Sequence, residues 1–316
     1  MHITILDGHA LNPGDLSWKA LEELGSLTVY PRTKAEEVIE HIGSSDAILI
    51  NKINITEAIL EACPQVKYIG VQATGYNVVD IEACKKHGVT VTNVPAYSTA
   101  AVAQLTFAFM SEAACRTKLH SDSVLQGDWT TCPDFCYWKT PLTELEGKTL
   151  GIFGYGNIGR RVAQIAQAYG MKVIVCTRTQ KPDIPNPVDF DTLLSQSDIL
   201  TLHAPLTAQT SGIINRSSIA KMKKSAWIIN TARGAFVNEA DICDALTQGN
   251  LAFYAADVVS QEPMAKDCPL LKAPKDKILI TPHIAWAAIE TRKRLLEVVV
   301  QNLRAWTEGK SQNVVS

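Results

Sequence analysis

The chain has 316 residues, which suffices for about two domains at roughly 150 residues each and excludes a miniprotein held together by disulfides. Hydrophobic residues make up 46% and charged residues 20% of the chain, so an intrinsically disordered or fibrous protein is excluded. The net charge is −2, from 30 basic and 32 acidic residues without a dense basic run, and nucleic acid is therefore not expected as a partner.

Neither secretion nor a membrane span is predicted. The first ten residues lack the basic start and long apolar core of a signal peptide, and the most apolar stretch, 99–115, is interrupted by polar residues. Eight cysteines are scattered through the chain, as expected of reduced thiols, so we expect a cytoplasmic protein. Cys132 and Cys136 have no second Cys or His pair nearby, and no metal site is predicted.

The first hundred residues alternate between short apolar runs and segments with helical spacing, a pattern typical of a parallel sheet covered by helices. Helices are predicted at 35–42 and 56–63. Strands are predicted at 2–6, 27–30, 47–50, 68–72 and 89–94.

A long Ala-rich helix is predicted over 99–125, followed by a polar and aromatic connection that contains Pro133 and Pro141. A second α/β series then begins, which indicates a domain boundary. A final helix over 289–307 carries one apolar stripe and is expected to return to the first domain. Strands of the second series are predicted at 149–153, 172–176, 199–203, 227–230, 253–258 and 278–281.

A glycine loop follows the first strand of the second series. Between a strand and an amphipathic helix, this spacing is the fingerprint of dinucleotide binding, since the glycines permit a tight turn and a close approach of the backbone to a pyrophosphate. A tight turn without a ligand is the alternative. The residues expected to bind the cofactor here are Gly154, Tyr155, Gly156, Asn157, Ile158 and Gly159.

The carboxylate that usually binds the ribose hydroxyls is missing at the end of the next strand. Thr177 and Arg178 stand there, Lys181 follows, and no Asp or Glu occurs from 151 to 182. Because a guanidinium can bind a 2′-phosphate in a bidentate manner, NADP is favoured over NAD. The alternative is an NAD enzyme in which Arg178 stacks on adenine or faces solvent.

Three residues after the glycine loop form a set suited to the reduction of a keto acid. Arg233, Glu262 and His283 each follow a predicted strand, and residues past the carboxyl ends of parallel strands converge on the ligand crevice. A guanidinium can bind an acid and polarise its carbonyl, and an imidazolium can donate the proton that accompanies hydride transfer. A carboxylate beside the imidazole favours its protonated form.

Five segments together resemble the D-isomer-specific 2-hydroxyacid dehydrogenase family. They are the glycine loop and the segments 203–207 (HAPLT), 230–234 (NTARG), 257–263 (DVVSQEP) and 281–285 (TPHIA). The resemblance implies that Arg233 binds the substrate, that His283 is the general acid or base, and that Glu262 is its partner. The chain is therefore expected to be an NAD(P)-dependent oxidoreductase.

The resemblance also assigns binding residues. Asp257 is expected to hold the nicotinamide carboxamide, and the backbone amides of Ala73, Thr74 and Gly75 to bind the substrate carboxylate. His203 is expected to line the cofactor crevice and not to catalyse. The cofactor contacts implied in this way are Thr106, His203, Ala204, Pro205, Thr231 and Ala232.

The family architecture implies two doubly wound parallel-sheet domains, with a Rossmann coenzyme domain inserted into a flavodoxin-like substrate domain. The substrate domain is expected to comprise 1–98 and 287–316, and the coenzyme domain 99–286. A homodimer through the coenzyme domains is usual in the family. Trp138 is expected either to reach a neighbouring subunit's active site or to pack at the surface.

Within the family, the segments 73–77, 93–95, 134–138 and 283–286 most resemble bacterial glycerate dehydrogenases, also called hydroxypyruvate reductases. Hydroxypyruvate and glyoxylate are thus the expected substrates, with Trp286 either beside the substrate or in the core. Residues 71–80 contain no Lys or Arg, which disfavours a phosphorylated substrate. The alternatives are a D-lactate or aryl-2-keto-acid dehydrogenase and a dinucleotide-sensing adaptor without enzymatic activity.

Overall fold

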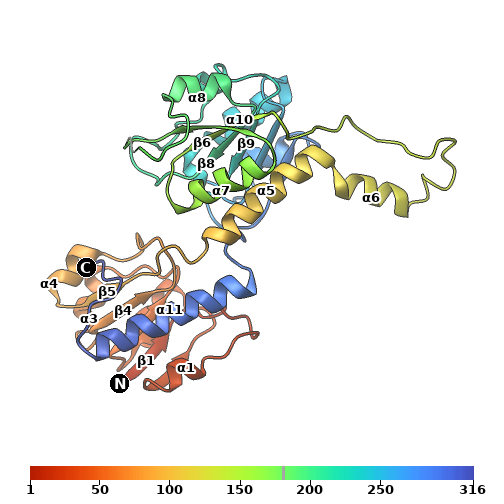
Figure 1. The fold of residues 1–316 in the computed structure, drawn as a ribbon. Helices are drawn as coiled ribbons and strands as arrows, with labels where there is room; N and C mark the ends of the chain where they lie inside the picture. The colour runs from red at the N-terminus through yellow and green to blue at the C-terminus, as the bar shows by residue number, and fades with distance from the viewer. Residues whose placement is uncertain (180–181) are drawn as a thin grey trace. The chain divides into compact units, whose positions relative to one another are not determined.

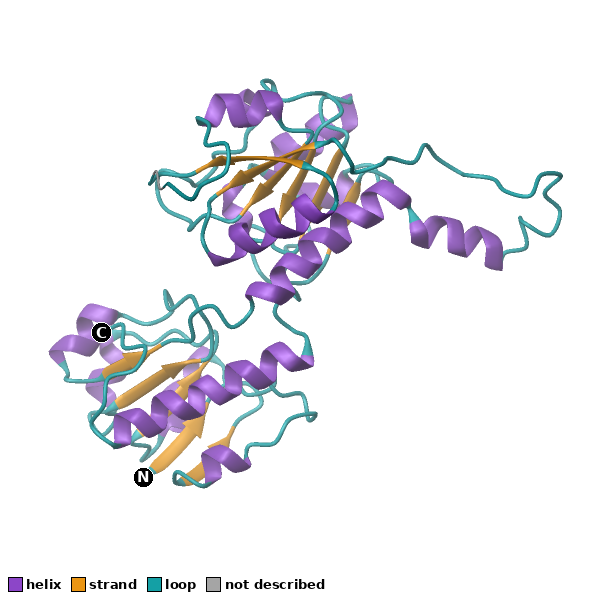
Figure 2. Cartoon of the chain, in the orientation of Figure 1, coloured by secondary structure: helices purple, strands orange, loops and turns teal. Residues whose placement is uncertain are grey.

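The chain forms two compact α/β units, as a computed structural model of residues 1–179 and 182–316 shows (Figure 1). One unit consists of Met1–Ser98 and Trp286–Ser316, and the other of Thr99–Ala285. Each unit is built on a sheet whose paired strands all run parallel, with helices on both faces (Figure 2). The predicted fold class is thereby confirmed.

The first unit contains a five-stranded sheet in the order β2-β1-β3-β4-β5. Its central strands are buried throughout because helices cover both faces, which explains their continuous aliphatic sequences. The strands are β1 (His2–Ile5), β2 (Ser26–Val29), β3 (Ala47–Ile50), β4 (Tyr68–Val71) and β5 (Thr90–Thr92). The helices are α1 (Lys19–Glu22), a 3₁₀ turn η1 (Ala35–Glu37), α2 (Val38–Ile42), α3 (Glu57–Ala62), α4 (Ile81–Lys86) and α11 (Ile289–Thr307).

The last helix, α11, closes one face of this sheet (Figure 1). Leu295, Val299 and Leu303 recur every four residues and pack into the core beside Tyr68. The guanidinium of Arg292, at the start of α11, binds both carboxylate oxygens of Asp15 at 2.7 and 2.6 Å and lowers the pKa of that carboxyl. The C-terminal helix is thus an integral part of the first unit.

The second unit contains a six-stranded sheet in the order β11-β10-β9-β8-β6-β7. Helices α5 and α7 cover one face, and α8, α9 and α10 cover the other. The strands are β6 (Thr149–Phe153), β7 (Lys172–Cys176), β8 (Ile199–Leu202), β9 (Trp227–Asn230), β10 (Phe253–Ala256) and β11 (Ile278–Ile280). The helices are α5 (Thr99–Cys115), α6 (Thr117–Leu125), α7 (Asn157–Ala168), α8 (Phe190–Gln196), α9 (Arg216–Ile219), the 3₁₀ turns η2 (Gly234–Phe236) and η3 (Pro269–Lys272), and α10 (Glu239–Gln248).

The single helix predicted over 99–125 is wrong, because the chain forms two helices there. Arg116 separates α5 from α6 and adopts a left-handed conformation, with φ of 50°. This conformation interrupts the helical hydrogen-bond ladder. Arg116 also places its guanidinium over the Phe253 ring, 4.9 Å from the centroid, so a tertiary contact accompanies the break.

In the described part of the chain, no helix combines the length and the apolarity needed to cross a bilayer.

Candidate active site

The glycine loop joins β6 to α7 at the point where the strand order reverses between β6 and β8. Gly154 has φ of +97°, and a side chain there would lie 2.5 Å from the Ala204 nitrogen. A side chain on Gly159 would lie 2.2 Å from the Gly154 oxygen. By contrast, open space faces Gly156, the N-cap of α7, which makes no side-chain capping bond. The backbone amides at the start of α7, where Asn157 and Ile158 lie, thus suit the pyrophosphate of a dinucleotide.

The two strands next to β6 bring further predicted residues to this loop. Gly154 donates a hydrogen bond to the Cys176 oxygen at 2.8 Å, so Thr177 and the exposed Arg178 follow directly beside the loop. Arg160 lies over the Tyr155 ring, 4.7 Å from its centroid, and pairs with Asp183. Lys181 lies outside the described residues.

His203 follows β8, and its backbone amide bonds to the Phe153 oxygen at 2.8 Å. Both ring nitrogens are buried, and neither has a hydrogen-bond partner among the described residues. Burial lowers the pKa of His203 to about 3, which keeps the imidazole neutral. An orphaned imidazole beside the glycine loop fits a polar cofactor. The next residue, Ala204, packs its backbone against Gly154, and Pro205 is exposed.

The turn after β9 carries Arg233 and is shaped by a buried asparagine. The Asn230 amide donates to the Arg233 oxygen at 2.9 Å and accepts from the Ala232 nitrogen at 3.1 Å. The Arg233 side chain is exposed and bonds to the Ala232 oxygen at 2.7 Å. The buried Thr231 hydroxyl lies 3.1 Å from that of Thr106 on α5. The hydrogen bonds of Asn230 thus shape the turn that carries Arg233, and the exposed guanidinium is accessible to an anionic ligand.

Gly234 connects the arginine turn to the segment that carries Glu262. A side chain on Gly234 would lie 1.9 Å from the Val259 carbonyl carbon and 2.3 Å from the Ser260 nitrogen, so only glycine permits this contact. The two backbones meet although they lie 25 residues apart in the chain.

Glu262 and His283 form a direct pair. The Glu262 Oε2 atom lies 2.6 Å from His283 Nδ1, and its Oε1 atom accepts from the Val259 nitrogen at 3.2 Å. About a third of each side chain is exposed. The carboxylate therefore holds one ring nitrogen, so Nε2 is the imidazole nitrogen left for proton exchange with a ligand.

Asp257, at the end of β10, holds the loop that bears His283. Its buried carboxylate accepts from Thr281 Oγ1 at 2.5 Å and from the Ile284 and Ala285 nitrogens, each at 2.8 Å. The His283 nitrogen bonds to the Asp257 oxygen at 2.8 Å, and His283 has φ of 55°. These bonds stabilise a left-handed conformation that is uncommon for residues other than glycine.

The other residues predicted to bind the substrate, besides Arg233 and His283, lie in the first unit. The carbonyl groups of Ala73 and Thr74 accept hydrogen bonds from the Val94 nitrogen and the Asn93 amide, at 3.0 and 2.8 Å, and Gly75 follows. Trp286 is half-buried against the core of this unit.

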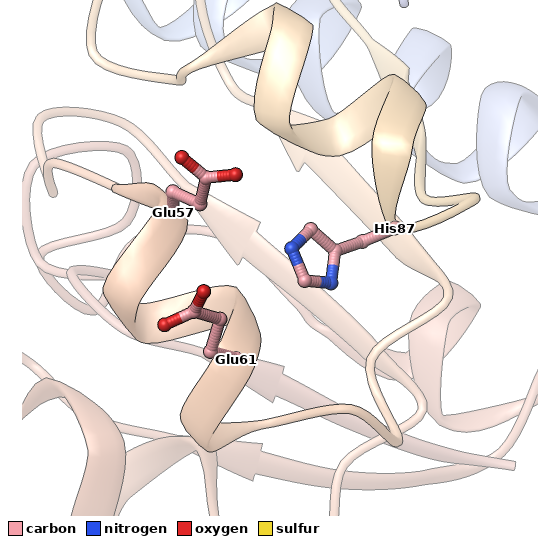
Figure 3. A group of neighbouring side chains, drawn as sticks. All are labelled: Glu57, Glu61 and His87. Carbon is pink, nitrogen blue, oxygen red and sulfur yellow. The ribbon is translucent and has the colours of Figure 1, made fainter.

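A separate group of polar side chains lies on the surface of the first unit (Figure 3). Glu57 and Glu61 lie one turn apart on α3, and His87 follows α4; each offers one atom within 4.8 Å of the others. Glu57 is, however, paired with Lys86 at 3.2 Å, and Glu61 is exposed. The ammonium group already balances one of the two carboxylates, so we assign no metal to this cluster.

Sequence reasoning missed the roles of Asn230 and Gly234. Both stand in a motif that it singled out, and an Asn between a buried strand and a turn is a usual signal of a side-chain clamp. The contact of Gly234 has no such local signal, because its partner is remote in the sequence.

Comparisons with known proteins agree with this geometry. Residues 107–285 match the family described as D-isomer specific 2-hydroxyacid dehydrogenase, NAD binding domain. The chain is 46% identical over 323 residues to a hydroxypyruvate reductase of Blautia hydrogenotrophica, covering 100% of both chains. It is 39% identical over 280 residues to a glycerate dehydrogenase of Methylorubrum extorquens, covering 89% of this chain and 88% of that one.

Among solved structures, an acyclic imino acid reductase in complex with NADPH and D-Arg superimposes with a TM-score of 0.87 at 28% identity, over 100% of both chains. The fold, the glycine loop with its open helix end, the Glu262–His283 pair and these similarities lead to one conclusion. The chain belongs to the D-isomer specific 2-hydroxyacid dehydrogenase family and is an oxidoreductase that acts on 2-hydroxy acids with a nicotinamide dinucleotide.

Proposed function

We propose that the enzyme reduces hydroxypyruvate and glyoxylate and that it interconverts hydroxypyruvate and D-glycerate reversibly. The observation that carries the proposal is the Glu262–His283 pair, 2.6 Å apart, on a segment packed against the arginine turn at Gly234. The names of the two relatives, a hydroxypyruvate reductase and a glycerate dehydrogenase, support this substrate class.

The chain's own residues supply the acid and the anion-binding group. When bound, the reduced dinucleotide supplies the hydride to the keto carbon. His283, protonated and held at Nδ1 by Glu262, donates the proton to the keto oxygen, so the carbonyl becomes a hydroxyl. Arg233 binds the substrate carboxylate and polarises the carbonyl. In the reverse direction, neutral His283 accepts the hydroxyl proton.

We assign the substrate's acid group also to the backbone amides of Ala73, Thr74 and Gly75. The carbonyl groups of Ala73 and Thr74 are committed to neighbouring residues, which supports a role for the amides of this loop. The lack of Lys and Arg in residues 71–80 favours a substrate without a phosphate group. Trp286, three residues after His283, is assigned to the substrate pocket.

We propose NADPH as the preferred coenzyme. The support is the exposed Arg178 beside the glycine loop, together with the absence of Asp and Glu from 151 to 182 in the sequence. The NADPH bound to the structurally similar imino acid reductase is consistent with this choice.

Steady-state oxidation of NADPH with hydroxypyruvate, glyoxylate, pyruvate and phenylpyruvate tests the function. Hydroxypyruvate is expected to have the highest kcat/KM, and fastest turnover of pyruvate or phenylpyruvate would contradict the substrate. His283→Ala should lower kcat by roughly 10²- to 10⁴-fold, the usual contribution of an acid–base residue, with unchanged cofactor affinity. Arg233→Ala should also raise KM. Tight cofactor binding without turnover would indicate an adaptor.

We further propose a homodimer through the segment that includes α6 and the connection after it, which projects from the sheet of the second unit (Figure 1). Leu125, Phe135 and Trp138 are 82%, 88% and 67% exposed in the single chain. Such exposure of large apolar groups is typical of a surface that a second copy covers. Light scattering should give the mass of two chains.

We also propose the cytoplasm as the compartment, and the eight free cysteines support this proposal.

A further inference from the structure

Glu239 is a buried carboxylate to which neither the sequence analysis nor the proposed mechanism assigns a role. It is the first residue of α10 and is 9% exposed. Its Oε1 atom accepts a hydrogen bond from the Ser260 nitrogen at 2.7 Å, and its Oε2 atom accepts from Cys268 Sγ at 3.4 Å. The cost of burying a carboxylate is offset only when such donors bind it.

Capping of α10 does not explain this carboxylate. The side chain of Asn238 already accepts from the Ala240 and Asp241 nitrogens, at 3.1 and 3.2 Å. An acidic residue in the first turn of a helix usually interacts with the amides of its own helix. The two oxygens of Glu239 instead bind groups that lie 21 and 29 residues away in the sequence.

The Ser260 amide belongs to the segment that carries the partner of His283. In this segment the Val259 nitrogen donates to Glu262 Oε1, and Glu262 Oε2 reaches His283 Nδ1 at 2.6 Å. Gly234 packs against Val259 and Ser260 from the side of the arginine turn. Glu239 thus holds the middle of a short turn, and the Glu262–His283 pair depends on the position of that turn.

We infer that Glu239 is a positioning residue that fixes the 259–262 turn through the Ser260 amide and so keeps Glu262 against His283. The inference rests on the proposed function, in which His283 exchanges the proton. Glu239 holds the turn through the length of its side chain and its acceptor oxygen, and its negative charge is not required for this role. It touches no reacting atom.

The other groups around Glu239 are consistent with this role. Burial raises the pKa of the Cys268 thiol, and Glu239 raises it further, so Sγ stays protonated and donates to Oε2. Burial likewise raises the pKa of Tyr254, which lies near both groups. Arg216 pairs with Asp241 and Asp244 on the outer side of α10.

Two substitutions of Glu239 and one control separate the effect of side-chain length from that of charge. Glu239→Asp keeps the charge but withdraws the oxygens by one methylene group, while Glu239→Gln keeps the reach and the acceptor but removes the charge. Cys268→Ala is the matched control, because it removes the second partner of Glu239 and leaves the Ser260 bond intact. Thermal unfolding and NADPH binding are measured for each variant, together with kcat and KM for hydroxypyruvate.

E239D is expected to lower kcat about 10- to 100-fold, because a displacement of about 1 Å can cost roughly 10²-fold, with unchanged NADPH affinity. E239Q and C268A should stay within about threefold of wild type. The inference is overturned if E239D matches wild type, or if E239Q or C268A is impaired as strongly as E239D. Glu239→Ala also removes the hydrogen bond to Ser260 and should behave as E239D does.

A readout without substrate separates this inference from the proposed function. A short bond from His283 Nδ1–H to Glu262 gives a downfield proton resonance in nuclear magnetic resonance spectra, assigned by its loss in His283→Ala. The resonance should persist in E239Q and C268A and disappear in E239D. If wild type reduces no keto acid, the proposed function fails, and the resonance still decides whether Glu239 positions the pair; its persistence in E239D refutes the inference.

Discussion

Replacement of Asp257 by asparagine tests how the His283 loop is held. The carboxylate accepts three hydrogen bonds, from Thr281 Oγ1 and from the Ile284 and Ala285 nitrogens, and Asp257 is 1% exposed. Asparagine retains one oxygen and places an NH₂ group at the other position. In either orientation, at least one of the two backbone amides then faces a donor instead of an acceptor.

The magnitude follows from these bonds. Loss of one hydrogen bond to a charged group costs about 1.5 to 3 kcal/mol, and a buried donor left without a partner costs about 1 to 3 kcal/mol. Because the two costs overlap, Asp257→Asn should reduce the stability of the second unit by about 2 to 4 kcal/mol. A displacement of His283 by about 1 Å should lower kcat roughly 10²-fold.

The assay compares kcat from NADPH oxidation with the dissociation constant of NADPH from fluorescence titration. Asp198→Asn is the control, since that carboxylate accepts from the Thr149 nitrogen at 2.8 Å, at the opposite end of the strands, and should affect stability without affecting kcat. If Asp257→Asn keeps kcat within about threefold of wild type but weakens NADPH binding tenfold or more, the carboxylate serves the dinucleotide and the reasoning is refuted.

Three other results are expected. Arg178→Gln should lower kcat/KM for NADPH but not for NADH. The control Arg161→Gln, on the exposed side of α7, should change neither value. A wild-type preference for NADH would contradict the coenzyme proposal. In Gly234→Ala, the added methyl group would lie 1.9 Å from the Val259 carbonyl carbon and should displace the 259–262 turn. The substitution should lower kcat and reduce the stability by about 1 to 3 kcal/mol. A wild-type kcat in this variant would show that the arginine turn and the 259–262 turn are not coupled. The pKa of His203 is about 3 in the folded protein, below the value of about 6.5 in the unfolded chain, so His203 contributes fully to the free energy of unfolding above pH 6.5. As the pH falls from 6.5 toward 3, this contribution is lost by up to about 1.4 kcal/mol per pH unit. The melting temperature of wild type should therefore fall more steeply below pH 6.5 than that of His203→Gln, and parallel declines would contradict this.

Much of the fold could be predicted because its signals are local. The predicted strands 47–50, 149–153, 172–176 and 227–230 agree with the structure, since each is a short buried run bounded by turn residues. The break at Arg116 could not be predicted, because no Gly or Pro marks it in the sequence and the left-handed turn is accompanied by a tertiary contact with Phe253.

The candidate site divides in the same way. The residue types and their places after strand ends indicated Arg233, Glu262 and His283, because parallel strands deliver such residues to one edge of a sheet. The supports of these residues stayed hidden. The Gly234 contact with Val259 and the hydrogen bond of Glu239 to Ser260 join groups that are 25 and 21 residues apart, a spacing that no sequence period encodes.

The sequence by itself determined the alternation of strands and helices, the glycine loop and the chemical groups of the site, since these depend on hydrophobic period and on residue type. Only the tertiary structure decided which atoms meet. The 2.6 Å contact of Glu262 with His283 and the three bonds of Asp257 depend on how β9, β10 and β11 lie side by side, and that order arises from packing of the whole sheet.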